Sequence, residues 1–190
     1  MELVTPTIAK LPDYARALER GWSPDNLRPE LATEQLVEIS QDANAFVAGL
    51  QDNGSRDDEV VLPDGSRVPR LPSMRRWIWD AGFCGTIGLR WQAGTEALPP
   101  TCAGHIGYAV VPWRRNQGHA SAALIAVLPM ARAVGLNHVD LSTDPDNLAS
   151  IRVMERAGAE FVERFRMSEP LGGREAVRYR IQLTSPGRKG

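Results

Sequence analysis

The sequence is poor in the residues that build disulfide frameworks and metal sites. Its 190 residues include only two cysteines, Cys84 and Cys102, and they do not form a CxxC pair. This excludes a disulfide-rich scaffold. The three histidines, His105, His119 and His138, show neither HxxxH nor HxH spacing. We therefore expect no metal, and the scarcity of cysteine favours a reducing compartment.

Long apolar runs and an excess of either charge are also missing. Residues 1–14 hold no apolar stretch as long as a signal peptide or a membrane span, so we expect neither, and we expect a cytoplasmic protein. The 22 basic and 23 acidic residues leave a formal charge of -1. This balance argues against a nucleic-acid or anionic-membrane partner. Any anion site in the chain has to be local.

What remains is the composition of an ordinary globular protein, with 43% hydrophobic and 24% charged residues. A length of 190 residues favours one domain with a sizeable core. We expect a single domain over 1–190, in which residues 1–70 form an N-terminal strand and helices and residues 74–183 form the main core.

Hydrophobic periodicity and turn residues predict the order of the elements. Helices are expected over 12–21, 31–50, 118–135 with Pro129 inside, and 147–157; strands over 2–9, 74–80, 83–91, 105–111, 137–143, 161–167 and 176–183; turns at 53–55, 63–65 and 81–82; and a polar tail over 185–190. The strand–helix–strand unit around Gly118 implies parallel strands. The expected fold class is mixed α/β (α+β), with a largely antiparallel central sheet flanked by helices.

One junction points to an anion. The segment YAVVPWRRNQGHASAAL, residues 108–124, passes from an apolar strand through arginines and a glycine into an alanine-rich helix. A helix start carries unpaired N–H groups and partial positive charge, which suit a phosphate. Gly118 has no Cβ and lets a ligand approach closely, while Arg114 and Arg115 add charge. Neither a P-loop nor a GxGxxG pattern is present. The alternative is a plain helix start with solvated arginines.

The junction resembles motif A of the GNAT superfamily of acyl-CoA N-acyltransferases, [QR]-x-x-G-x-[GA], over residues 115–120, RNQGHA. The preceding HIGYAVVPWRR looks like the fourth strand of that superfamily. The later DPDNLASIRVMERAGAEF is similar to its Asn/Ser helix, with Asn147, Ser150, Gly158 and Phe161. Both segments are also similar to the ribosomal-protein N-terminal acetyltransferase branch. The resemblance covers about residues 83–166 and implies a GNAT-like fold with splayed middle strands.

The resemblance implies an acetyl-CoA-dependent N-acetyltransferase without a metal. Residues 74–183 would bind coenzyme A and residues 1–70 would face the acceptor. The pyrophosphate would lie on the backbone of the junction, pantetheine along the strand, and the amide of Val110 near the thioester carbonyl. The implied coenzyme A residues are Val110, Val111, Arg115, Asn116, Gln117, Gly118, His119, Ala120, Ser121 and Asn147.

The catalytic candidates are His105, Tyr108 and Ser150. Many superfamily members carry a tyrosine in the later helix as the acid for the leaving thiolate, but this chain has Met154 there, which cannot donate a proton. Ser150 is the nearest candidate in sequence, and helix bracing is its alternative role. His105 replaces a glutamate of the similar branch and has a suitable pKa for a base; a structural hydrogen bond is its alternative. The alternative for Tyr108 is a core position on one face of the strand.

The expected reaction is transfer of an acetyl group from acetyl-CoA to a primary amine by direct attack in a ternary complex. One alternative is a coenzyme A-binding sensor or scaffold with weak catalysis, which Met154 keeps open. Another is an unrelated α/β protein that binds a phosphorylated metabolite, against which the helix with Asn147 and Ser150 argues. The acceptor is expected to be an amine-bearing small molecule, peptide or protein, and the chain to be a monomer or a homodimer.

Overall fold

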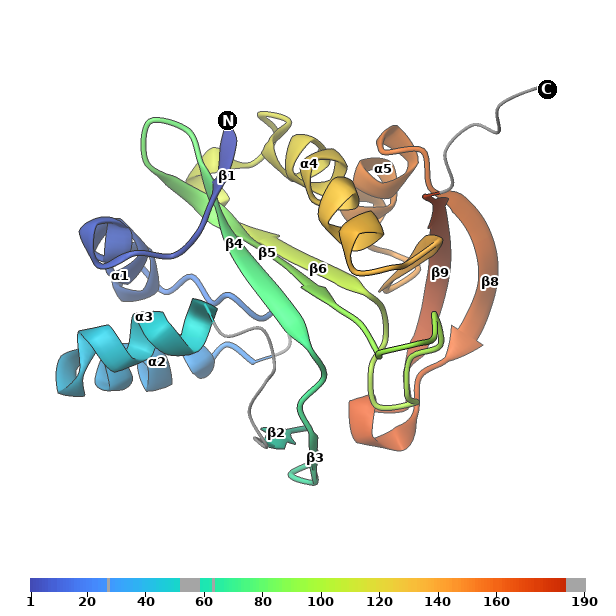
Figure 1. The fold of residues 1–190 in the computed structure, drawn as a ribbon, viewed down its shortest axis with the longest axis horizontal. Coiled ribbons are helices and arrows are strands. Elements are labelled where there is room, and N and C mark those ends of the chain that lie inside the picture. Colours follow the sequence, from blue (N-terminus) through green and yellow to red (C-terminus); the bar gives the residue numbers. More distant parts are fainter. Residues whose placement is uncertain (27, 52–58, 63, 184–190) are drawn as a thin grey trace.

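The computed structural model describes residues 1–26, 28–51, 59–62 and 64–183 (Figure 1). The helices are α1 (Leu11–Glu19), α2 (Leu31–Gln41), α3 (Ala43–Gln51), α4 (His119–Ala133) and α5 (Leu148–Arg156), with short 3-10 turns η1 (Ile8–Lys10), η2 (Pro112–Arg114) and η3 (Glu169–Leu171). The strands are β1 (Glu2–Val4), β2 (Glu59–Val61), β3 (Arg67–Pro69), β4 (Ser73–Trp79), β5 (Phe83–Arg90), β6 (Ile106–Val110), β7 (His138–Thr143), β8 (Glu160–Arg166) and β9 (Glu175–Gln182). The expected turn at 53–55, Pro63 and the tail at 185–190 lie outside the described residues.

Two separate sheets form the frame of the molecule. One has the strand order β1-β4-β5-β6 and the other β7-β9-β8, and every strand pair described within them is antiparallel. The expected mixed α/β fold is confirmed. Strands β6 and β7, joined by α4, are edge strands of different sheets and form no ladder within the described residues. The middle strands are therefore splayed, as expected. The two strands predicted to be parallel around Gly118 are not hydrogen-bonded to each other.

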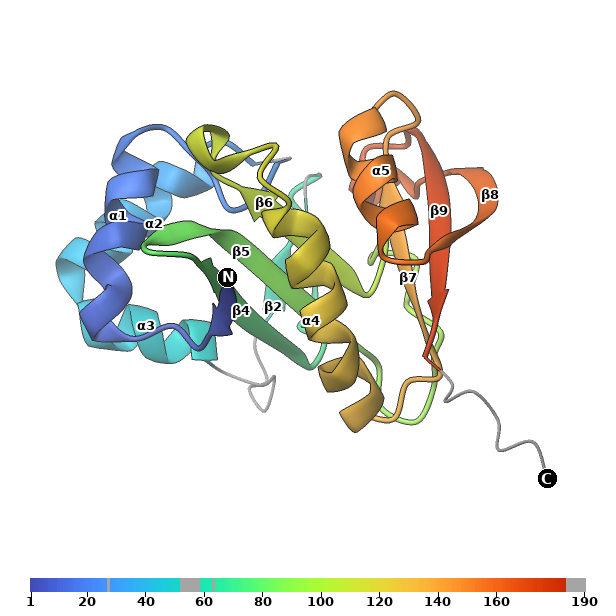
Figure 2. The same ribbon diagram turned by 90° about the horizontal axis from the view of Figure 1, so that it is seen from above.

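Helices cover both sides of the four-stranded sheet (Figures 1 and 2). Helices α1, α2 and α3 lie on one side and α4 on the other, with α5 beside the second sheet. The α1 side has an aromatic core in which the rings of Tyr14 and Trp77 stack with centroids 5.0 Å apart. The α4 side has an aliphatic core that includes Leu124 and Leu141. Burial on both faces makes the sheet a firm platform for the groups at its edge.

Two predicted elements are corrected by the structure. The expected helix over 31–50 is two helices, because Asp42 takes an extended conformation (φ -154°, ψ 95°) and its Oδ1 accepts the N–H of Ala45 at 2.9 Å. Aspartate in that conformation is a good N-cap, so a new helix begins there. The expected strand over 2–9 ends at Val4, since Pro6 has no N–H to donate to a ladder. The chain then enters η1.

Other local predictions are confirmed. Strands β4 and β5 meet at a hairpin in which Ala81 and Gly82 have φ of 50° and 138°, and β2 and β3 pair around the turn that contains Gly65. Helix α4 continues through Pro129 to Ala133, and Gly135 follows it with a φ of 91°. Among the described residues, no helix has the length and apolar character to cross a membrane.

The two sheets touch at the foot of β6. A Cβ on Gly104 would lie 2.9 Å from the carbonyl oxygen of Asp140, so only glycine lets the chain lie directly on β7 at this point. The N–H of His105 donates to that oxygen at 2.7 Å, and Ser142 Oγ donates to the carbonyl oxygen of Ala103 at 2.5 Å. Beyond this contact, and among the residues described, β6 pairs with β5 alone, so its other edge borders a gap between the sheets.

Candidate active site

The start of α4 is a cluster of backbone donors. Gly118 is its N-cap, with a left-handed backbone (φ 81°, ψ -3°) and no side chain to cap the helix, and Asn116 also has a positive φ of 60°. The first helical bond runs from the N–H of Ala122 to the carbonyl of Gly118 at 3.0 Å. The N–H groups of residues 119–121 therefore have no acceptor within the helix. A Cβ on Gly118 would meet nothing within 4 Å, so the space beside these donors is open to an anion.

The side chains around this turn have separate roles. Arg115 Nε donates to the carbonyl oxygen of Val110 at 3.2 Å, which places an exposed cation beside the end of β6. The ring of His119 is only 5% exposed. Its Nε2 lies 3.3 Å from Gln117 Oε1 and its Nδ1 lies 3.9 Å from Asp80 Oδ2. The ring therefore braces the turn from inside, and the contribution of His119 to an anion site is confined to its backbone N–H.

The free edge of β6 is formed by Tyr108 and Val110. The N–H of Val111 donates to Cys84 in β5 and its carbonyl accepts from Arg114, both at 3.0 Å. The N–H of Val111 is therefore not available to pantetheine, and the expected pairing of Val111 stays a prediction that depends on the second lone pair of its carbonyl oxygen. In an antiparallel pair, successive residues point their N–H groups alternately toward and away from the partner strand. The N–H groups of Tyr108 and Val110 accordingly face the gap.

Two hydroxyl groups meet across the gap. The hydroxyl of Tyr108, from β6, lies 2.8 Å from Ser150 Oγ, from α5, and 3.3 Å from the Ser150 carbonyl oxygen. Burial raises the pKa of Tyr108, an effect that the hydrogen bond to Ser150 only partly offsets. The phenol is therefore protonated at neutral pH and can act as a proton donor. The sequence singled out both residues but not their contact, which a strand and a helix far apart in the chain create.

Two further candidate positions, Asn147 and Met154, have structural roles at α5. Asn147 is the N-cap of this helix, and its Oδ1 accepts the N–H of Ser150 at 3.1 Å. This bond fixes the backbone of Ser150 where its hydroxyl reaches Tyr108. The implied contact between Asn147 and coenzyme A stays a prediction. Met154 is 1% exposed and belongs to the main core, so the helix position that carries a tyrosine in other family members is occupied here by a packing residue.

His105 is placed by the structure at the contact between the sheets. Its side chain is 1% exposed, and its Nδ1 accepts the N–H of Asp140 at 3.0 Å. A neutral ring that accepts at Nδ1 carries its proton on Nε2, and Nε2 has no hydrogen-bond partner among the described residues. Burial lowers the pKa of His105, and the nearby Asp140 carboxylate opposes this effect. A ring whose lone pair is already bonded is poorly suited to accept a substrate proton, so the geometry favours the structural role.

The lowered pKa of His105 predicts a loss of stability in mild acid. Below its ordinary pKa of about 6.5, the unfolded chain takes up a proton that the folded ring resists, so the free energy of unfolding falls as the pH falls. Urea unfolding at pH 5 and pH 7 measures this difference. We expect His105→Gln, whose amide oxygen can accept the N–H of Asp140 without titrating, to lose less stability between the two values than the wild type. An equal loss in both proteins would contradict the assignment.

Together these features define a class of site. Exposed N–H groups at a helix start suit a phosphate, and a free strand edge suits an extended chain that carries amides. Both lie at the gap between the two sheets, next to a hydroxyl pair. A ligand with a pyrophosphate and an amide-bearing arm fits these groups. Within the described residues, no three histidine, cysteine or acidic side chains gather to hold a metal ion.

Comparison with known families agrees with this description. The family described as the acetyltransferase (GNAT) domain matches residues 66–160, half of the 190 residues, and the chain belongs to this family. As a member of this family it is an acetyltransferase. A search of curated protein sequences finds no match.

Solved structures of acetyltransferases share the fold over nearly the whole chain. The microcin C7 self-immunity acetyltransferase MccE, in complex with acetyl-CoA and AMP, has a TM-score of 0.58 at 11% identity, covering 95% of this chain and 91% of its own. The ribosomal L7/L12 α-N-protein acetyltransferase RimL, in complex with coenzyme A, has 0.58 at 14%, covering 95% and 92%. A chimera of the Vibrio cholerae spermidine N-acetyltransferase SpeG and hSSAT has 0.58 at 14%, covering 96% and 97%. These identities support the fold and not a choice of acceptor.

Proposed function

We propose that the protein transfers the acetyl group of acetyl-CoA to a primary amine by direct attack in a ternary complex. The observation that carries this proposal is the hydroxyl pair of Tyr108 and Ser150 in the gap between the sheets, beside the free edge of β6. In this arrangement the N–H groups of residues 117–121 bind the pyrophosphate, with Arg115 as a nearby cation. Residues 74–183 form the coenzyme A side of the single domain, and residues 1–70 the acceptor side.

The N–H of Val110 is the proposed oxyanion donor. It belongs to a strand that is hydrogen-bonded to β5 on its other side, so its direction is fixed before any ligand binds. A fixed donor aimed at the carbonyl oxygen stabilises the negative charge that develops there during attack. Pantetheine would run along the same edge and bond to the backbone groups of Tyr108 and Val110 that face the gap.

The transfer can be balanced with the groups at hand. The amine nitrogen forms a bond to the thioester carbon, and the carbonyl oxygen becomes an oxyanion near the Val110 N–H. When this intermediate collapses, the carbon–sulfur bond breaks and the sulfur leaves with the electron pair. The sulfur then takes the phenolic proton of Tyr108, and the phenolate regains a proton from solvent through Ser150. Because a thiol has a pKa of about 8.5, the sulfur needs only modest help as a leaving group.

The two protons that the nitrogen loses are assigned to water: one leaves before attack, because only the neutral amine has a lone pair, and the other leaves the nitrogen as the intermediate collapses. His105 has its lone pair bonded to the Asp140 N–H, so it does not supply the base in this proposal. Without a side-chain base, the fraction of neutral amine is set by the pKa of the acceptor itself. An α-amino group, with a pKa near 7.7–8.0, is far more often neutral at physiological pH than a lysine amine near 10.4. The site therefore favours an α-amino acceptor.

The alternative of a coenzyme A-binding sensor with weak catalysis rested on Met154. Its side chain lies in the core, while Tyr108 from another element supplies a hydroxyl in the gap. Tyr108 can therefore supply the proton donor that is missing at the Met154 position. The sensor remains a second candidate that the same experiment separates.

A panel of α-amines, lysine analogues and polyamines, read by release of free thiol and by mass spectrometry, tests the proposal. We expect acetyl-CoA to raise the melting temperature, ATP to leave it unchanged, and α-amines to be acetylated faster than lysine analogues at pH 7.5. Stabilisation by acetyl-CoA without an acetylated product from any amine would support the sensor. Stabilisation by ATP alone would contradict both functions.

A further inference from the structure

A cavity of about 580 Å³ lies outside the gap between the sheets. Residues 96–103 of the loop between β5 and β6 form one wall, and strands β7 and β9 form another, with His138 and Arg180 among the lining residues. Val139 and Leu141, which alternate with the lining residues of β7, point into the core beneath α4. The cavity therefore faces away from α4, and Figure 1 shows the loop beside β9 on that side. Its volume is that of a small-ligand pocket.

A buried donor without a partner points to a ligand. His105 lines this cavity, its side chain is 1% exposed, and its Nε2 has no partner among the described residues. Since Nδ1 accepts the N–H of Asp140, Nε2 carries a hydrogen. A buried N–H without an acceptor destabilises a fold, so its retention calls for an explanation. An oxygen atom of a bound ligand would satisfy it.

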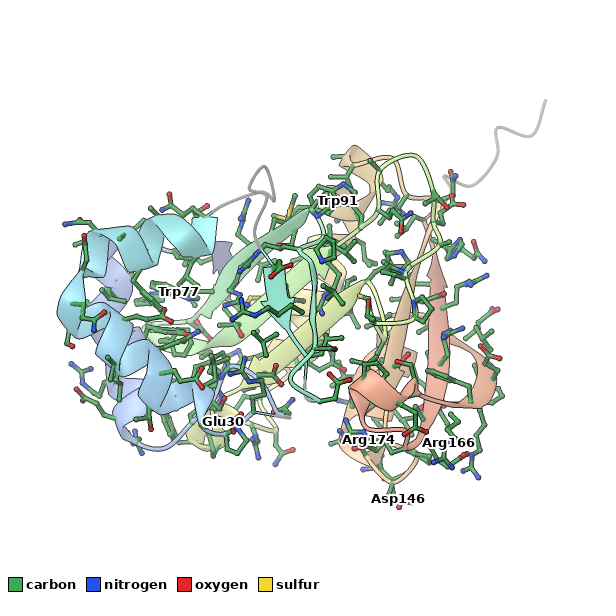
Figure 3. All side chains as sticks on the ribbon, turned by 90° about the horizontal axis from the view of Figure 1, so that it is seen from below. Glu30, Trp77, Trp91, Asp146, Arg166 and Arg174 are labelled. Carbon is green, nitrogen blue, oxygen red and sulfur yellow. The ribbon has the colours of Figure 1, made fainter. Side chains whose placement is uncertain are left out.

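Guanidinium groups around the cavity offer hydrogen-bond donors to an oxygen atom. Arg180 binds Asp140 through Nε and Nη2 at 2.7 and 2.9 Å. Arg178 lies over the ring of Phe165 at 4.3 Å and donates to Glu163 through Nη1 at 2.5 Å. These contacts hold both guanidinium groups in place and leave several of their N–H donors without an acceptor in the part of the chain that the structure describes. Arg166, which Figure 3 labels at the end of β8, also lines the cavity, and its Nη2 lies 3.8 Å from Glu169 Oε1.

We propose that this cavity binds the carboxylate of the acceptor, and that the acceptor is a short peptide with a free α-amino group and a free carboxyl terminus. This inference rests on the proposed acetyl transfer. The extended segment from His105 through β6 to Val110 spans about 16 Å, at about 3.3 Å per residue. An extended peptide of about four or five residues covers the same distance. Such a peptide reaches from the cavity, where His105 Nε2–H and the arginines hold its carboxylate, to the thioester.

Matched pairs of peptides, each with a carboxylate or an amide at the C-terminus and three to seven residues long, test the proposal. We expect kcat/KM to be on the order of tenfold higher for the acid than for the amide, as for one hydrogen bond to a charged group, with the largest ratio at four or five residues. A ratio near one at every length would overturn the proposal.

Variants of the lining residues test whether the preference for the carboxylate peptide arises in this cavity. Ala97→Trp, at an exposed lining position of the loop, should fill the cavity and bring the acid-to-amide ratio close to one. His105→Leu should do the same, while His105→Gln, which retains an N–H donor, should keep most of the preference. Ile125→Trp, on the exposed side of α4, is the matched control and should keep the wild-type ratio. An unchanged ratio in both Ala97→Trp and His105→Leu would overturn the assignment of the cavity.

Binding measurements test the carboxylate site independently of the proposed reaction. Calorimetry of the acid and amide pentapeptides, with coenzyme A present, needs no turnover. Tighter binding of the acid that is lost in Ala97→Trp supports the cavity even if no amine is acetylated, a result that would refute the reaction alone. Equal affinity for acid and amide refutes the carboxylate site even if both peptides are acetylated.

Discussion

Gly118→Asp is expected to weaken the binding of coenzyme A by on the order of 100-fold. Gly118 has a φ of 81°, a left-handed conformation that aspartate and asparagine adopt more readily than other L-residues, so the charge of the new side chain is the main cause. The aspartate brings a negative charge next to the donors of the α4 N-terminus, where the pyrophosphate is proposed to lie. Two like charges about 5 Å apart near a protein surface repel by about 3 kcal/mol, and each 1.4 kcal/mol is a factor of ten in affinity. Solvent screening moderates the total.

Calorimetry with coenzyme A measures the effect, and two further variants separate its causes. Gly118→Asn adds a neutral side chain that tolerates a left-handed backbone, so it should lose far less affinity than the aspartate. Gly135→Asp is the matched control, because Gly135 has a similar φ of 91°, and a Cβ there also meets nothing within 4 Å, but it follows the other end of α4. We expect its affinity to stay within about twofold of the wild type. Unchanged binding in Gly118→Asp would remove the anion site from this turn.

Elements with strong local signals could be predicted from the sequence. The helix starts at Gly118 and Asn147 and the hairpin at Ala81–Gly82 depend on the conformations of a few neighbouring residues, which the residue types indicate. The break at Asp42 was missed although its capping signal is local, because the apolar periodicity on both sides continues through it. The early end of β1 was missed because one proline leaves the apolar pattern of residues 2–9 intact. In the structure, Pro6 has no N–H to donate to a neighbouring strand.

Only those parts of the candidate site that are formed by residues close together in the sequence could be predicted. The turn at Gly118 follows from its own sequence, whereas the direction of each N–H in β6 depends on which strand pairs with it. The resemblance therefore assigned pantetheine contacts to both Val110 and Val111, and the hydrogen bond from Val111 to Cys84 shows that, of these two, only Val110 has its N–H directed away from β5. Tyr108 and Ser150 are 42 residues apart in the sequence. Their contact depends on the packing of α5 across the gap, which no local pattern encodes.

Tyr108→Phe is expected to lower kcat by on the order of 100-fold. The variant keeps the ring and removes the hydroxyl that is proposed to protonate the leaving sulfur. Loss of a general acid or base costs about 10²–10⁴-fold, and the lower end applies because a thiolate is already a good leaving group. The affinity for coenzyme A should change little, since the proposed anion site lies at α4. Steady-state kinetics and calorimetry on the same preparation measure both.

The pH dependence gives a second measurement on the same residue. Burial raises the pKa of Tyr108 above its ordinary value of 10.0, so the phenol keeps its proton throughout the neutral and mildly alkaline range. A general acid is active while it is protonated, and its activity is lost as the pH rises through its pKa. We therefore expect kcat of the wild type to show no alkaline fall below about pH 10, the ordinary tyrosine pKa. A fall centred near pH 8 would assign the acid to another group.

A double-mutant cycle tests whether Tyr108 and Ser150 act as a pair. Ser150→Ala removes the hydroxyl 2.8 Å from the phenol and should lower kcat by about tenfold, the effect of one hydrogen bond to a charged group. If Ser150 acts through Tyr108, the double variant should be no slower than Tyr108→Phe alone, because groups that act as one unit are not additive. Tyr179→Phe removes a hydroxyl from β9, in the main core, and serves as the control with near-normal turnover. If Tyr108→Phe keeps kcat within about threefold of the wild type, far less than the loss of a general acid, water protonates the sulfur and the hydroxyl pair only braces the gap.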